Sequence, residues 1–273
     1  MDDRPPGRSF QAGLRVRAVR GQRRSVRTGP RDLGVAASTA RYAEDLRYNI
    51  DIAQHVGSRE SQQDSYSIRQ DESGWLGVIC DGMSGYRDNA AAARAAAAAF
   101  AEQWESVRGG EDFTEWMEDA LISAQSAVLD LGARAHLSPG VTGTTLLAAG
   151  SRDDRLWWIS VGDTSLFLMR DELFELLNIL HIQEMAGGAP GSYLGAPEIR
   201  EVDRSPSPLR LRHGDLVLMA SDGLTMAMTI DELGGLLRGQ SDIGARDLVG
   251  RALAMDRPAQ DNLTVIIVRV SDE

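Results

Sequence analysis

The chain has 273 residues, of which 42% are hydrophobic, and this is enough for one large domain with a sizeable core. No apolar run approaches the roughly 20 residues of a membrane-spanning helix, and the N-terminus lacks the apolar segment of a signal peptide. The net charge of −11 argues against nucleic-acid binding by the main domain. We therefore expect a cytoplasmic protein that makes no membrane contact.

Residues 1–45 differ in composition from the rest of the chain. They show neither a helical nor an alternating period, mix proline, glycine and serine with many arginines, and predict a disordered N-terminal extension. An arginine-rich, acid-poor leader can also be a transit peptide, a nucleic-acid arm or sequence upstream of the true start, and these alternatives stay open. We expect the folded domain to occupy residues 46–273.

The predicted elements of that domain begin with a strand from about Tyr48. Two helices follow, an alanine-rich one after the capping pair Asp88-Asn89 and one over residues 113–131 whose apolar residues recur at three-and-four spacing. Strands joined by short turns come next, and short connections imply antiparallel pairs. These strands cover residues 144–149, 156–161, 165–170 and 173–177.

The second half of the domain repeats this alternation. Glycines and prolines in residues 178–197 predict a long surface excursion. Helices that arrive in pairs, and not between successive strands, favour antiparallel sheets with the helices outside. The remaining predicted elements are strands at 209–212 and 215–221, helices at 230–238 and 245–256, and a last strand at 263–270.

Four times in this chain an apolar run meets an aspartate. Asp81, Asp163 and Asp222 follow such runs, and Asp261 precedes one. One aspartate at the end of a strand is ordinarily a turn residue, but strands of one core can bring four such ends together. Converging carboxylates repel one another unless cations lie between them, and purely oxygen ligands select hard ions such as Mg²⁺ or Mn²⁺. The pattern therefore indicates a metal cluster.

Short motifs surround these aspartates in a fixed order. They are Gly57-Ser58-Arg59, Gln62-Gln63-Asp64, Asp81-Gly82-Met83, Gly143-Thr144-Thr145, Val161-Gly162-Asp163, Gly214-Asp215, Ser221-Asp222-Gly223 and Asp261-Asn262-Leu263-Thr264. In this combination the chain resembles, from about Tyr48 to Val270, a bacterial metal-dependent Ser/Thr protein phosphatase of type 2C. The resemblance implies an α+β fold, a four-layer αββα sandwich of two antiparallel sheets flanked by helix pairs.

The resemblance also implies a set of metal ligands. Asp81 would bridge two Mn²⁺ or Mg²⁺ ions, and the carbonyl of Gly82 would bind the second ion. Asp222 and Asp261 would complete the first. Asp163 matches the position that, together with Asp222, holds a weaker third ion in bacterial members.

Two further residues would be catalytic. By resemblance, Asp64 would orient water on the metals and Arg59 would hold the substrate phosphate. The planar guanidinium suits a phosphate because it donates two hydrogen bonds at once. Taken alone, Arg59 would be an ordinary solvated arginine, and its assignment depends on its spacing from Asp64.

The expected activity is hydrolysis of phosphoserine and phosphothreonine in proteins by water that two metal ions activate. The implied partners are phosphoproteins, such as a Ser/Thr kinase and its targets. Segments 164–165 and 178–181 depart from the family pattern, which leaves the substrate more open than the chemistry. Two alternatives therefore remain: an inactive module that binds phosphorylated partners, and a phosphatase for small phosphomonoesters.

Overall fold

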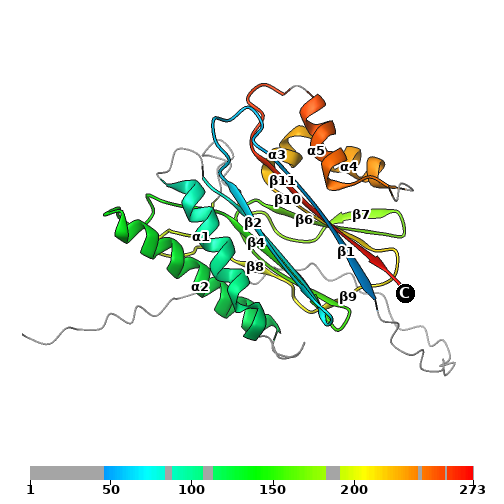
Figure 1. Cartoon of the computed structure of the whole chain (residues 1–273), viewed down its shortest axis with the longest axis horizontal. Helices are drawn as coiled ribbons and strands as arrows, with labels where there is room; N and C mark the ends of the chain where they lie inside the picture. The colour runs from blue at the N-terminus through cyan, green and yellow to red at the C-terminus, as the bar shows by residue number, and fades with distance from the viewer. Residues whose placement is uncertain are drawn as a thin grey trace, which may run out of the picture.

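Two antiparallel sheets face each other in the computed structural model, with helices on both outer sides (Figure 1). The model describes residues 46–83, 88–106, 113–182, 191–238, 242–255 and 257–272. The predicted N-terminal extension, residues 1–45, lies outside these ranges. The α+β sandwich expected from the sequence is confirmed.

The first sheet has five strands in the order β1-β11-β10-β6-β7. Its interior strand β11 is mostly apolar and is buried at almost every position, because both of its faces are covered. The strands are β1 (Arg47–His55), β6 (Ser165–Arg170), β7 (Leu173–Leu176), β10 (Leu216–Ala220) and β11 (Leu263–Ser271).

The second sheet follows the order β2-β3-β4-β5-β8, and β9 also pairs with β5. Every pairing in both sheets is antiparallel among the described residues, as the short predicted connections require. The strands are β2 (Asp64–Asp71), β3 (Gly74–Asp81), β4 (Leu146–Arg152), β5 (Arg155–Val161), β8 (Asp203–Arg204) and β9 (Leu209–Arg210).

Helices complete the four layers. One apolar cluster joins α1 and α2 to the second sheet, another joins α3, α4 and α5 to the first, and a third fills the space between the sheets. Figure 1 shows the two helical groups at opposite sides of the molecule. The helices are α1 (Asn89–Glu102), the 3₁₀ turn η1 (Gln103–Ser106), α2 (Phe113–Arg134), α3 (Asp222–Ala227), α4 (Ile230–Leu237) and α5 (Ala245–Ala254).

The structure corrects three local predictions. The Asp88 side chain does not cap α1, because this residue has a left-handed backbone (φ 55°) and its side chain accepts no hydrogen bond from the helix. Helix α3, which begins at Asp222, was not expected. The described ends of the 178–197 stretch form a surface excursion only in part, since Asn178, His181 and Leu194 are buried whereas Ile179 and Ile182 are exposed. Residues 183–190 of that stretch lie outside the described ranges.

The described helices include none that is both long and apolar enough to cross a bilayer.

Candidate active site

The hairpin β2–β3 brings two of the predicted site residues together. Asp64 and Asp81 are register partners at the end of the hairpin away from its turn. Asp81 is held by its backbone: its N–H donates to Thr145 Oγ1 (3.0 Å), and its carbonyl accepts from the N–H of Thr145 (2.8 Å) and from Thr144 Oγ1 (2.9 Å). The strand end that carries the Asp81 carboxylate is therefore fixed from the neighbouring strand.

The Asp64 carboxylate is buried and oriented by two hydroxyls. Its Oδ2 accepts hydrogen bonds from Ser221 Oγ (2.8 Å) and Thr264 Oγ1 (2.7 Å). Its Oδ1 is buried without a partner, as is Oδ1 of Asp222. Two acceptor oxygens in the same region are thus left for other donors or for cations.

Asp222 and Asp261 come from two neighbouring loop segments. Asp222 opens α3 directly after β10, and Asp261 lies just before β11, the strand that pairs with β10. The backbones touch: a Cβ on Gly223 would lie 2.0 Å from the carbonyl oxygen of Asn262. Only glycine fits there, so the Asp-Gly pair at the start of α3 is required by close approach.

Arg59 is brought to the same place by the loop between β1 and β2. Its Nη2 lies 2.5 Å from Asp261 Oδ2. Asn262 ties this loop down, because its side-chain amide donates to the carbonyls of Val56 (2.7 Å) and Ser61 (3.2 Å), and its Oδ1 accepts from the N–H of Gln63 (2.7 Å). A Cβ on Gly57, whose φ is +64°, would lie 2.1 Å from the carbonyl oxygen of Asp261.

Asp163 lies in the turn between β5 and β6, and this turn is held from the 178–182 segment. The N–H of Gly162 donates to His181 Nδ1 (3.1 Å), and Asn178 Nδ2 donates to the carbonyl of Thr164 (2.9 Å). Thr164 Oγ1 also lies 2.9 Å from Thr145 Oγ1, which links this turn to the residue just before β4.

The carboxylates are close enough to shift one another's pKa. Burial, followed by the charges of Asp64, Asp222 and Asp163, raises the pKa of Asp81 well above its usual range. Burial and the charge of Asp261 raise the pKa of Asp222, which shares a hydrogen bond with Asp81, although Arg59 opposes the shift. The five predicted carboxylates therefore form one electrostatic cluster.

Burial also dominates at the two other buried members of the cluster. It raises the pKa of Asp64 to about 6 against the hydrogen bonds from Thr264 and Ser221, which lower it. Burial, together with the charge of Asp222, raises the pKa of Asp163 to about 7. Each of these acids would become more acidic next to a cation.

The donor set fits hard divalent ions, because it consists of oxygens and includes the buried Oδ1 of Asp222, which has no partner. In the described part of the chain, no three Asp, Glu, His or Cys side chains are grouped closely enough to hold one ion as they stand. The roles of Asp81, Asp163, Asp222 and Asp261 as ligands therefore remain proposals. Gly82 donates its N–H to the carbonyl of Gln63 (3.2 Å), which fixes the loop after β3.

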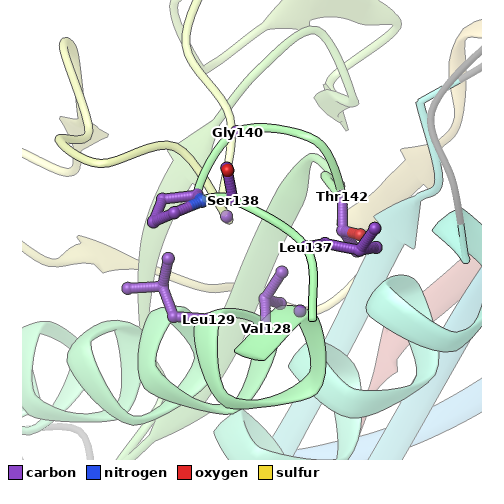
Figure 2. Close-up of a pocket in the computed structure, with 9 residues that line it drawn as sticks. Val128, Leu129, Leu137, Ser138, Gly140 and Thr142 are labelled. Atoms are coloured by element: carbon purple, nitrogen blue, oxygen red, sulfur yellow. The ribbon is translucent and has the colours of Figure 1, made fainter. Parts of the chain in front are cut away.

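A separate hollow at the C-terminal end of α2 has no part in this cluster (Figure 2). Nine residues without a charged side chain line it, and Figure 2 shows the Val128 and Leu129 side chains of α2 facing the 137–142 loop. It contains none of the predicted site residues. The chemistry of the protein is therefore sought at the carboxylates.

The family model described as protein phosphatase 2C matches residues 53–234, more than half of the chain. The chain belongs to the protein phosphatase 2C family. This family comprises metal-dependent enzymes that hydrolyse phosphoserine and phosphothreonine. The match ends before Asp261, so the place of that residue in the phosphatase site rests on its contacts with Arg59 and with the start of α3.

Individual phosphatases resemble this chain over most of its length. A serine/threonine phosphatase stp of Listeria innocua is 24% identical over an alignment of 211 positions that covers 70% of this chain and 82% of that protein. The structure of an S. agalactiae serine/threonine phosphatase has a TM-score of 0.70 at 21% identity, covering 82% of this chain and 99% of that one. The catalytic domain of the serine threonine protein phosphatase PstP, solved in complex with 2 manganese ions, has a TM-score of 0.70 at 24% identity, covering 83% and 100%.

Sequence reasoning assigned no role to the residues that orient the predicted ones. Ser221 and Thr264 belong to the sequence motifs, but their contacts with Asp64 join positions 157 and 200 residues apart. Asn262 and Gln260 hold loops through their side-chain amides. The sequence signal that could have indicated such orienting residues is a polar residue next to an aspartate, as Ser221 is next to Asp222 and Asn262 is next to Asp261.

Proposed function

We propose that this phosphatase hydrolyses phosphoserine and phosphothreonine of proteins at the cluster beside Arg59. The observation that supports this is the position of one arginine among five carboxylates: it pairs with Asp261, and its charge opposes the rise that burial and Asp261 cause in the pKa of Asp222. The arginine provides a positive charge for an anionic phosphate, and the carboxylates provide negative charges for cations.

The carboxylates would hold the metal ions. Asp81 would contribute to holding both of two Mn²⁺ or Mg²⁺ ions, Asp222 and Asp261 would hold the first, and the Gly82 carbonyl would hold the second. Asp163 would hold a weaker third ion together with Asp222. When bound, such ions lower the pKa of water and neutralise charge on the phosphoryl oxygens.

Asp64 and Arg59 would act on the reactants. Because Ser221 and Thr264 occupy Oδ2 of Asp64, its Oδ1 is the atom available to accept a hydrogen bond from the attacking water. The Arg59 side chain is 37% exposed, so its guanidinium can reach a phosphate that enters from solvent. Its charge-assisted hydrogen bonds would orient the phosphoryl group for in-line attack.

Phosphoproteins are the substrate class that the family implies. A Ser/Thr kinase and its targets as partners, and a cytoplasmic location, remain predictions from the sequence.

Hydrolysis of para-nitrophenyl phosphate and of a phosphothreonine peptide, with and without Mn²⁺, tests the proposal. We expect turnover only with the metal and a higher kcat/KM for the peptide. Metal-independent binding of the peptide without turnover would instead support a binding module. Preference for the small ester would support a phosphomonoesterase.

A further inference from the structure

Gln260 joins the loop segments that present two of the proposed metal ligands. It is 7% exposed and immediately precedes Asp261. Its Nε2 donates to the carbonyl of Gly223 (2.9 Å), the residue after Asp222, and lies 3.4 Å from the carbonyl of Asp261. One side-chain amide therefore bridges the start of α3 and the segment before β11.

The backbone of Gln260 holds a third segment. Its carbonyl accepts from the N–H of Ser58 (2.8 Å), the residue before Arg59. A Cβ on Gly57 would lie 2.5 Å from the same carbonyl oxygen, so the two segments are in direct backbone contact. Gln260 thus contacts all three segments that carry Arg59, Asp222 and Asp261.

These segments need such a connection because their carboxylates repel each other. The charge of Asp261 is the largest effect of a neighbouring group on Asp222, after burial. Holding two like charges at the separation that one ion requires costs free energy before the ion binds. Hydrogen bonds between the two backbones offset that cost and reduce the reorganisation on binding.

Packing alone does not explain a glutamine here. Its Oε1 is buried and has no partner, and an apolar side chain would avoid that desolvation cost. What an apolar side chain cannot supply is the N–H donor to the Gly223 carbonyl. The donor is therefore the feature that distinguishes Gln260 from a leucine at this position.

We propose that Gln260 is a positioning residue whose side-chain amide sets the spacing of Asp222 and Asp261 and thereby the affinity of the ion they share. This inference rests on the proposed ligand roles of both aspartates. Gln260 acts through the two backbones and does not itself contact substrate.

The test is the Mn²⁺ affinity of the full chain with Gln260→Leu, measured by calorimetric titration beside melting in EDTA. Loss of a partner that orients a ligand typically weakens metal binding about 10- to 100-fold, and we expect a rise in Kd of that order. Turnover should recover at saturating Mn²⁺. A Kd within about twofold of wild type, in a variant that melts cooperatively, would overturn the proposal.

Gln125→Leu is the matched control. Gln125 is also buried, donates to the carbonyl of Ala196 (2.7 Å) and accepts from the N–H of Gly195 (2.7 Å), and neither of these partners is a carboxylate. The Gln125→Leu substitution should lower the melting temperature and leave the Kd for Mn²⁺ unchanged. Equal weakening of Mn²⁺ binding in both variants would show a general loss of stability and reject the specific role.

Two further variants separate the possible failures. If Gln260→Leu does not fold, Gln260→Met replaces it, and failure of both to melt cooperatively makes Gln260 a folding residue and rejects the proposal. Asp222→Asn tests the ligand assignment itself. If it binds Mn²⁺ normally, the proposed function fails at that residue; if it loses Mn²⁺ while Gln260→Leu keeps it, only the inference about Gln260 fails.

Discussion

Asp64 and Asp81 face each other across the open end of the β2–β3 hairpin, Asp64 as the first residue of β2 and Asp81 as the last of β3. Their carboxylates raise each other's free energy when both are charged, and the charge of Asp64 is, after burial, the largest cause of the raised pKa of Asp81. A cation between them would reverse that effect. Protonation of these two carboxylates and binding of a cation between them should therefore both change the stability of the fold.

The metal-free protein should lose stability as pH rises. Burial raises the pKa of Asp64 to about 6 and that of Asp163 to about 7, whereas an unfolded aspartate titrates near 3.8. The folded state thus holds protons that the unfolded state releases, so this contribution to stability is complete below about pH 4 and is lost as pH passes through 6 and 7.

Melting in EDTA from pH 4 to 8 measures this effect. Asp163→Asn should flatten the upper part of the curve, because it removes the acid that titrates near 7. A melting temperature that rises over this range would contradict the assigned shifts.

Asp222→Asn should abolish metal-dependent turnover while the protein stays folded. The substitution keeps the shape but removes a charge that raises the pKa of Asp81 and Asp163. Loss of a ligand should weaken Mn²⁺ binding by more than the roughly 100-fold that loss of an orienting partner can cost. Titration with Mn²⁺ checks the loss of metal binding, and melting in EDTA checks that the variant is folded. Near-normal turnover at saturating Mn²⁺ would reject the ligand role.

Arg59→Ala should lower kcat/KM for a phosphothreonine peptide by about 10- to 100-fold, since hydrogen bonds to charged groups contribute roughly 1.5–3 kcal/mol. Arg59→Lys should recover part of the loss because the ammonium keeps the charge but not the planar fork. An effect on KM alone would indicate uniform binding, and an effect on kcat a contact that tightens in the transition state. Steady-state kinetics at saturating Mn²⁺ distinguish these two effects. An unchanged kcat/KM in Arg59→Ala would exclude phosphate binding by this residue.

Asp163→Ala should remove a weak metal site and leave the stronger sites occupied. An ion that shares Asp222 with the main pair has fewer protein ligands of its own and should bind less tightly. Calorimetric titration should then show fewer weak sites in the variant, with turnover retained at high Mn²⁺. The same number of weak sites in both proteins would leave Asp163 as a turn residue.

A shortened chain that begins at Leu46 should melt at the same temperature as the full chain and hydrolyse para-nitrophenyl phosphate equally well. The strand β1 begins at Arg47 and pairs along its length with β11, so the shortened chain retains this edge of the sheet. Loss of cooperative melting would show that residues 1–45 contribute to the fold.

The sequence by itself determined the local elements and the chemical character of the site. Its apolar runs predicted the strands because burial on both faces of a central strand demands apolar residues at successive positions, as in β11. An aspartate at each of several strand ends indicated hard cations, because the oxygen chemistry of carboxylates does not depend on the fold.

Only the tertiary structure decided which side chains of the site make direct contact. The sequence predicts a strand that ends before Asp222 but no helix after it, whereas α3 begins at Asp222, and Gly223 lies against the carbonyl of Asn262 from a segment far along the chain. Arg59 meets Asp261 across 202 positions, and Thr264 meets Asp64 across 200. Such pairs depend on sheet register, which follows from the packing of whole strands and leaves no short-range pattern in the sequence.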